Sequence, residues 1–369
     1  MSDHGQRPRR SGINRQGVAG WIFVAPTILI LGLFMFVPVL MAAWVSLSNW
    51  NGHGSPLETG VGYVGGNNYV AVLNGQGIAG RDFGTSIRNN FYYALLVVPI
   101  QTAISLGLAT FVNRRALKGK AFFRTAFYFP SVTSSVAITV LWLFLFAGTG
   151  SVNSVLSWFG VHGPNWFQDS RGIFQILLNA LGVQTPANPP ASLFGISWWE
   201  WVAGPSVAMC AFIFMAVFTT SGTFMLLFLA ALQAIGEETD EAAMIDGASA
   251  WQRFRYVTVP MLRPTLFTVL TLGTIGTWQV FDQIYTGTKG GPSKTTLTPA
   301  YLSYDAAFTS QAWGRGSAIA FILFFIIIVF TLLQRMILGQ ADPTLPSRRD
   351  RLAQRRLSTL ARRGTTKGA

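Results

Sequence analysis

Six apolar segments alternate with polar ones along this chain of 369 residues. Each is as long as the roughly 20 residues that a helix needs to cross the hydrocarbon core of a bilayer, or longer. The segments cover approximately residues 20–47, 88–112, 122–147, 205–234, 261–285 and 316–338. Prolines such as Pro26, Pro38 and Pro99 lie inside them, and spanning helices tolerate proline better than soluble helices do. The pattern predicts an all-α integral membrane protein with about six transmembrane helices.

The composition supports a membrane protein and argues against an enzyme. Half of the residues are hydrophobic and 11% are charged, whereas soluble domains carry about 25% charge. The single cysteine, Cys210, excludes a disulfide within the chain, and His4, His53 and His162 are too far apart in sequence to indicate a metal site. We therefore expect no catalytic residues, no metal ligands and no cofactor bound by this chain.

Lysine and arginine gather in every second segment between the apolar runs. If the N-terminus is cytoplasmic, the inner segments hold 21 of the 27 Lys and Arg residues and the outer segments hold 6. This bias predicts that both termini are cytoplasmic. It also explains the net charge of +13 by topology, so we expect no nucleic acid as a partner. A signal peptide is the alternative for the first run, but that run is longer than a signal peptide's apolar region and five more follow.

The charge pattern also suggests how the chain is divided. We predict a basic cytoplasmic arm (1–19), a first helix with an outer loop (20–87), a helical core (88–338) and a basic cytoplasmic tail (339–369). The tail could contact anionic lipid, although a solvated tail is the better interpretation.

The longest outer segment, residues 148–204, contains the sequence GIFQILLNALGV. That sequence is too short to span, so it predicts an interfacial or short amphipathic helix. The segment ends in Trp198, Trp199 and Trp201, which we interpret as an aromatic belt at the outer interface, with a sugar-stacking platform as the alternative.

A polar segment separates the fourth and fifth apolar runs and is longer than the two to eight residues of a plain helix connection. Acidic residues crowd its start, where they suit a helix N-terminus, and Gly247 suits the left-handed residue that ends a helix. Ser249 and Gln252 then form a predicted capping box. The segment is predicted to form a helix–turn–helix that exposes residues 242–245 to a groove on a soluble partner.

The same segment carries a spaced motif. Glu241-Ala242-Ala243 is followed by Gly247 and then by Val257-Thr258-Val259-Pro260. This pattern resembles the EAA loop of the permease subunits of binding-protein-dependent ABC importers. Valine replaces the usual isoleucine and leucine, and Gly236 stands where a proline is usual.

Further segments are similar to the carbohydrate branch of that family. They are Asp246-Gly247-Ala248, PMLRPTL (260–266), FDQIYTGTKGGPSKTT (281–296) and SYDAAFTSQAWGRGSAIAFILF (303–324). Together they resemble the first permease subunit of a maltose-type or glycerol-phosphate-type importer. The resemblance covers about residues 20–338, and residues 171–200 look like an insertion without an assigned role.

The resemblance implies a type I ABC importer permease fold, a coupling loop at 236–260 and a bacterial cytoplasmic membrane location. It also implies the partners: a second permease subunit, two copies of an ATP-binding subunit, an extracytoplasmic solute-binding protein, membrane lipid and a carbohydrate. ATP and Mg would be used by the ATP-binding subunit, because GGPSKT (290–295) lacks the glycines of a P-loop. The residues expected to couple to the ATPase are Glu241, Ala242, Ala243, Asp246, Gly247 and Pro260.

The substrate path is predicted from one ionisable residue at membrane depth, Asp282, since such residues are functional candidates by default. Its neighbours in sequence offer aromatic faces and hydrogen-bonding groups suited to a sugar: Trp278, Gln279, Phe281 and Tyr285. The alternative is that these side chains pack between helices or that Asp282 caps a helix end. Weaker candidates are Asn90, Gln101 and Trp142.

Two other functions remain as alternatives at this stage. One is an ion-coupled secondary transporter or channel, which paired acids or bases within the spans would favour; apart from Asp282 the spans have almost none. The other is an ABC permease for an amino acid or peptide, but residues 281–324 favour a sugar.

Overall fold

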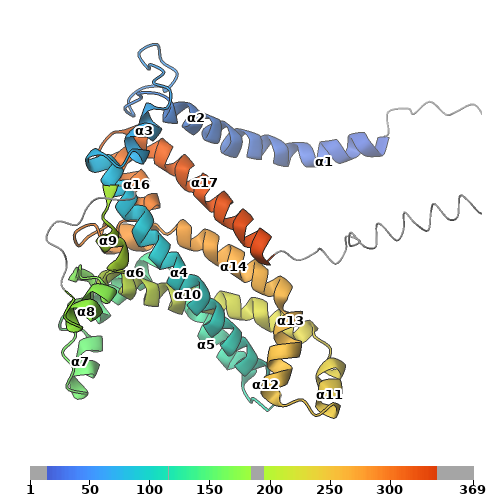
Figure 1. Cartoon of the computed structure of the whole chain (residues 1–369). Helices are drawn as coiled ribbons and strands as arrows, with labels where there is room; N and C mark the ends of the chain where they lie inside the picture. The colour runs from blue at the N-terminus through green and yellow to red at the C-terminus, as the bar shows by residue number, and fades with distance from the viewer. Residues whose placement is uncertain (1–14, 115, 184–194, 339–369) are drawn as a thin grey trace, which may run out of the picture. The chain divides into compact units, whose positions relative to one another are not determined.

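The computed structural model describes residues 15–114, 116–183 and 195–338, and every regular element within them is helical (Figure 1). The predicted basic tail and most of the predicted basic arm lie outside the described residues. The chain divides into two compact units, which are described separately: Met1–Val72 with Ser303–Phe321, and Leu73–Leu302 with Ile322–Ala369. The predicted division into arm, first helix, core and tail stays a prediction.

The first unit contains one long apolar helix. It is built from α1 (Arg15–Leu31), a π-helical turn (Gly32–Phe36) and α2 (Val37–Ser46). Of its most apolar stretch only 6% is buried inside the structure, and residues 17–46 are long and apolar enough to cross a membrane. An isolated helix that is apolar all round is suited to lipid or to a membrane partner. The first predicted span is thereby confirmed as a helix.

The C-terminal end of this helix is held by polar and aromatic contacts. The Asn68 side chain, in α3 (Asn67–Leu73), donates hydrogen bonds to the carbonyl oxygens of Ser46 and Ser48, at 2.9 and 3.0 Å. The ring of Trp50 lies 5.2 Å from that of Trp313. Trp313 begins α17, which runs to Leu338 and corresponds to the last predicted span.

Two short helical elements precede α17 in the chain. They are α16 (Pro299–Tyr304) and a π-helical turn (Asp305–Thr309).

The second unit is built around α4 (Gly77–Asn113) and α10 (Val207–Ala234), which pack against each other. The α10 helix matches the fourth predicted span. The α4 helix is 37 residues long and begins at Gly77, so the predicted start near residue 88 was too late. The reason is that residues 77–87 are helical but polar, and a hydropathy pattern does not detect them.

Two predicted spans are interrupted. The third predicted span forms α5 (Lys120–Val132) and α6 (Ser135–Leu145), which are bent by 94° relative to each other. Thr133 is extended there, with φ −74° and ψ 145°, and serine and threonine side chains compete with helical hydrogen bonds.

The fifth predicted span forms α14 (Arg263–Trp278) and α15 (Asp282–Gly287), separated by a break. Among the described residues, four helices are long and apolar enough to span, or five if the bent pair is one span. This arrangement is consistent with about six apolar helical segments, but two of them are broken.

Between α4, α10 and α14 lies an apolar core. Met225 and Phe228 of α10 are fully buried there, together with Ala109 of α4 and Val269 of α14. On another side, α10 packs closely on α5, because a Cβ atom added to Gly222 would lie 2.2 Å from the Phe127 carbonyl oxygen. Small residues allow such close approach of membrane helices.

Four short helical elements lie among the described residues between α6 and α10. They are α7 (Ser151–Trp158), a 3₁₀ turn (Trp166–Gln168), α8 (Ile173–Ala180) and α9 (Trp198–Val202). The α8 helix confirms that GIFQILLNALGV forms a short helix. Trp198 is exposed, whereas the indole nitrogens of Trp199 and Trp201 are buried. The aromatic belt itself stays a prediction.

Candidate coupling surface and translocation cavity

The polar segment between α10 and α14 forms a helical hairpin, which we call the polar hairpin. Its helices are α11 (Glu237–Ile245) and α12 (Ala250–Arg253). Between them Gly247 has a φ of +80°. The N–H of Gly247 donates to the Met244 carbonyl and the N–H of Ala248 donates to the Ala243 carbonyl, both at 3.0 Å. These are the two bonds of a Schellman motif, which satisfies the last carbonyls of a helix, so the predicted turn at Gly247 is confirmed.

The second helix of the hairpin starts at the predicted capping box. The Ser249 hydroxyl accepts from the Gln252 backbone N–H at 3.3 Å, and the Gln252 side chain accepts from the Ser249 backbone N–H at 2.7 Å. The Arg253 guanidinium donates to the Asp240 carboxylate at 2.8 Å, which connects the second helix to the first. The hairpin is therefore held by its own local contacts.

Large apolar side chains are exposed on this hairpin. Ile245 is 86% exposed and Trp251 69%, and Tyr256, in the turn that follows, is 73% exposed. An exposed apolar patch beside acidic residues is characteristic of a protein interface. Of the residues predicted to couple to the ATPase, Glu241, Ala242, Asp246 and Gly247 are exposed, and Ala243 is half-buried.

Pro260 lies apart from this exposed group. It is half-buried in α13 (Val259–Met261), after a π-helical turn (Phe254–Thr258). Because α14 begins at Arg263, Pro260 lies in a separate short helix just before it.

The capping box offers a direct test of hairpin stability. Replacing Ser249 by Ala removes the acceptor for the Gln252 N–H and should destabilise α12 by about 1 kcal/mol. Amide hydrogen exchange of residues 249–253 in the purified protein should then be several-fold faster. Ser249→Asp retains a capping oxygen and serves as the matched control. Equal protection in the Ser249→Ala variant would contradict a stabilising role for the cap.

A basic groove separates the hairpin from the ends of the long helices. It has a volume of about 730 Å³ and is lined by Arg114, Lys120 and Arg253, with Asp240 beside them. Local sequence patterns could not have found it, because its residues come from α4, α5, α10 and the hairpin.

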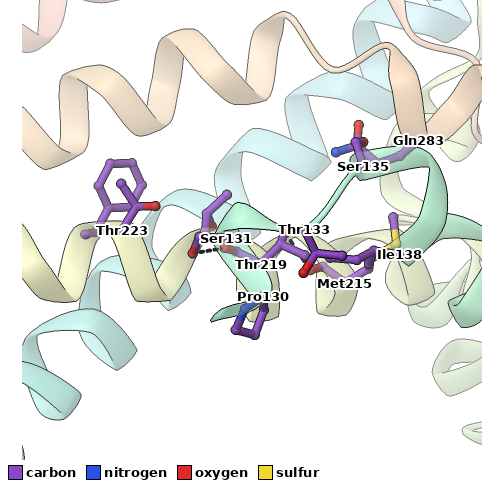
Figure 2. Close-up of a pocket in the computed structure, with 11 residues that line it drawn as sticks. Pro130, Ser131, Thr133, Ser135, Ile138, Met215, Thr219, Thr223 and Gln283 are labelled. Atoms are coloured by element: carbon purple, nitrogen blue, oxygen red, sulfur yellow. Dashed lines mark hydrogen bonds between the residues drawn. The ribbon is translucent and has the colours of Figure 1, made fainter. Parts of the chain in front are cut away.

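Two adjoining cavities lie deeper among the helices of the second unit. The first, which we call the bend cavity, has a volume of about 270 Å³ and lies beside the bend between α5 and α6 (Figure 2). The second, the central cavity, has a volume of about 340 Å³ and lies between α4, α10 and the break after α14. They share Thr219, Thr220, Phe224 and Gln283, so they form a continuous path of lining residues.

Hydroxyl and amide groups line much of this path. The hydroxyl-bearing residues of the bend cavity are Ser131, Thr133, Ser135, Thr219, Thr220 and Thr223. Figure 2 shows Ser131 beside Thr219. The Ser131 hydroxyl donates a hydrogen bond to the Thr219 carbonyl oxygen at 2.5 Å. The amides are Gln101, Gln279 and Gln283. Such groups hydrogen-bond to polar uncharged ligands.

One buried amide is only partly satisfied. Gln101 is 1% exposed, and its Oε1 accepts a hydrogen bond from the Thr220 hydroxyl at 2.6 Å. Its Nε2 has no partner within the described residues, and neither does the Ser135 hydroxyl. A buried polar group without a partner costs about 1–3 kcal/mol. Both atoms are buried, so neither is open to the cavities in this conformation.

The structure separates the predicted path residues into two groups. Gln279, Phe281 and Asp282 line the central cavity. Trp278 is only 2% exposed and packs on Phe330 with ring centres 5.1 Å apart, outside the lining. This is the packing arrangement that the sequence left as an alternative for Trp278.

Tyr285 also lies outside the lining of both cavities. Its ring stacks on that of Phe281 at 5.4 Å. It therefore supports a lining residue rather than facing the central cavity itself.

The weaker candidates for the substrate path also divide into cavity-lining and packed residues. Gln101 lines the central cavity, while Asn90 is fully buried and Trp142 packs among Phe146, Phe214 and Phe218.

Sequence reasoning missed the threonines of α10. The spacing of Thr219 and Thr223 within an apolar helix was the available signal, since residues four apart share one helix face.

A helical membrane protein with a polar internal path and an exposed hairpin has the architecture of a transport subunit. Residues 101–339 match the family described as the binding-protein-dependent transport system inner membrane component, and the chain belongs to this family. The chain is therefore a membrane-embedded permease subunit of an ABC importer.

Curated relatives cover most of the chain. The lactose transport system permease protein LacF of Rhizobium radiobacter is 31% identical, with 88% of this chain and 96% of the relative covered. The trehalose/maltose transport system permease protein MalF of Thermococcus litoralis is 29% identical, with 86% and 92% covered.

Solved structures share the fold. A chain of a bacterial ABC transporter involved in the import of the acidic polysaccharide alginate has a TM-score of 0.66 at 19% identity, with 89% of this chain and 97% of that chain covered. The same kind of transporter in complex with an alginate pentasaccharide-bound periplasmic protein has a TM-score of 0.65. These matches confirm the predicted ABC importer permease fold.

Proposed function

We propose that this chain moves a carbohydrate across the bacterial cytoplasmic membrane through the bend and central cavities, driven by ATP hydrolysis on a separate subunit. In this proposal both termini and the polar hairpin are cytoplasmic. The observation that carries the proposal is the lining of the two cavities, where hydroxyl and amide side chains meet aromatic faces. Sugar hydroxyls need such hydrogen-bond partners, and sugar ring faces pack on aromatic rings such as Phe281.

The polar hairpin is the proposed docking site for the ATP-binding subunit. Ile245, Met244 and Trp251 would enter a groove on that subunit, with Glu241 and Asp246 at the edge. The contacts that stabilise the hairpin are internal to it, so it can move as a unit when its partner moves. Two copies of the ATP-binding subunit and a second, membrane-embedded permease subunit would complete the importer.

Delivery of the sugar to the outer side is assigned to an extracytoplasmic solute-binding protein. The family description is binding-protein-dependent, and a structure neighbour is described in complex with a periplasmic protein that holds a pentasaccharide. Both support such a partner. An ion-coupled carrier has little support, because Asp282 is the one carboxylate among the described residues that line the two cavities.

Uptake by the reconstituted importer tests the proposal. The chain is purified with the second permease, the ATP-binding subunits and the binding protein, and the complex is placed in vesicles. We expect accumulation of a radiolabelled neutral oligosaccharide that requires both ATP and the binding protein. Uptake of amino acids or peptides but not of any sugar would contradict the carbohydrate assignment. Uptake driven by an ion gradient without ATP would contradict the ABC mechanism.

A further inference from the structure

The lining of the two cavities carries a net negative charge. Of the described residues that line them, none is Lys, Arg or His, and the one carboxylate is Asp282. Asp282 lies at the start of α15, where it faces the central cavity together with Gln279 and Gln283. The lining that this chain contributes therefore bears hydrogen-bonding groups and one negative charge.

Two cations on neighbouring segments, Arg88 and Lys294, have partners outside the cavities. The Arg88 guanidinium, on α4, donates to the Asn89 side chain at 2.8 Å and to the Glu200 carbonyl oxygen at 3.3 Å. The Lys294 ammonium, in the loop after α15, pairs with the Asp82 carboxylate at 2.6 Å. Neither residue lines the cavities, so neither is placed to neutralise an anionic ligand there.

An anionic sugar would enter such a cavity at a disadvantage. Its carboxylate would give up hydration and would find no cation in return, and a buried charge is costly unless it is paired. It would also be repelled by the Asp282 carboxylate, since like charges interact more strongly in a cavity than in water. A neutral sugar carries neither penalty, and its hydroxyl groups can pair with the threonine hydroxyls and glutamine amides that line the cavities.

We propose that the cavities of this chain select an uncharged carbohydrate and exclude a carboxylated one, with the Asp282 carboxylate as the residue that rejects anions. This inference rests on the proposed function and names the class of sugar. It also separates this chain from its structure neighbours, which are described as importing an acidic polysaccharide. At 19% identity that likeness concerns the fold, and the charge of the lining decides the ligand.

Protection of a cavity cysteine from alkylation tests the proposal. Native Cys210 is replaced by Ser, Thr223→Cys is introduced at the bend cavity, and the whole importer is placed in lipid nanodiscs. The rate of maleimide labelling is then measured with increasing concentrations of neutral di- to tetrasaccharides. The most protective neutral sugar is compared with the same sugar carrying a carboxylate at C6. We expect the carboxylated sugar to protect at a concentration at least about tenfold higher.

Matched variants show whether Asp282 is the cause. Asp282→Asn should reduce the difference between the two sugars to about threefold or less, by improving protection by the carboxylated sugar. Asp282→Glu retains the charge and should retain the difference. Glu58→Gln removes the same charge from an exposed outer residue and should leave the difference unchanged.

The outcomes separate this inference from the proposed function. Equal protection by the neutral and carboxylated sugars would overturn charge selection while leaving carbohydrate transport intact. A difference that persists in Asp282→Asn would overturn the role given to that carboxylate. If no sugar protects Thr223→Cys, the ligand does not occupy these cavities, and both the inference and the proposed path fail.

Discussion

A Gly247→Val variant is expected to fold and insert normally but to lose at least about tenfold of its ATP-dependent uptake, while the ATPase continues to turn over. Gly247 has a φ of +80°, a conformation that costs residues with a side chain about 1–2 kcal/mol. A β-branched residue such as valine is a genuine outlier there. The variant should therefore lose the turn and the two Schellman hydrogen bonds that end α11.

The cause of this effect would be conformational rather than steric. No atom lies within 4 Å of the position that a Cβ atom on Gly247 would occupy. The long helices of the second unit do not depend on this position, and we expect them to be unchanged. The altered part would be the orientation of Met244 and Ile245 relative to Trp251, and that surface is the proposed contact with the ATP-binding subunit.

Uptake and ATP hydrolysis should be measured together in reconstituted vesicles. Gly247→Asn is the matched control, since asparagine adopts the left-handed conformation more readily than other residues with a side chain, and it should retain most of the coupling. Circular dichroism checks that helix content is unchanged. Normal uptake by Gly247→Val would show that the turn does not transmit the motion.

A Gly222→Ala variant is expected to lower the stability of the helix bundle by about 1–3 kcal/mol, the usual cost of overpacking a well-packed interior. The added Cβ atom would lie 2.2 Å from the Phe127 carbonyl oxygen and 2.9 Å from the Tyr128 Cα atom. Both are backbone atoms, so no side chain can rotate away and α5 must move from α10. That movement would also break the hydrogen bond from Ser131 to Thr219, at the wall of the bend cavity.

Thermal unfolding of the detergent-solubilised protein measures this loss. Gly107→Ala is the control, because Gly107 lies within α4 and nothing lies within 4 Å of its added Cβ atom. Alanine is the better helix former by about 1 kcal/mol, so this variant should be as stable as the parent or more stable. If both variants unfold at the same temperature, the close approach of α5 and α10 does not limit stability.

Local patterns were sufficient for the polar hairpin. Glycine at residue 247 and the Ser249–Gln252 pair determine the conformation of their neighbours within a few residues, and the structure has the turn and the cap where they were predicted. Apolar runs likewise located the helices, because burial in lipid depends on composition along one helix and not on its partners. The spaced motif of the hairpin was also readable, since its positions lie within twenty residues.

The sequence could not predict the interruptions or the cavities. Runs 122–147 and 261–285 were each predicted as one span, and only the tertiary structure shows the bend at residues 133–134 and the break after Trp278. The hydrogen bond between Gln101 and Thr220 joins residues 119 positions apart. No local pattern records such a pairing.

The sequence by itself determined the membrane class, the approximate helices and the hairpin, because each depends on residues that are close together in the chain. Tertiary structure decided that Gln279, Phe281 and Asp282 line a cavity whereas Trp278 packs against Phe330. These residues are adjacent in sequence, and what separates them is the side of the broken helix on which each one lies. Packing of distant helices determines which side faces the cavity, and for that reason the path became visible only in the folded chain.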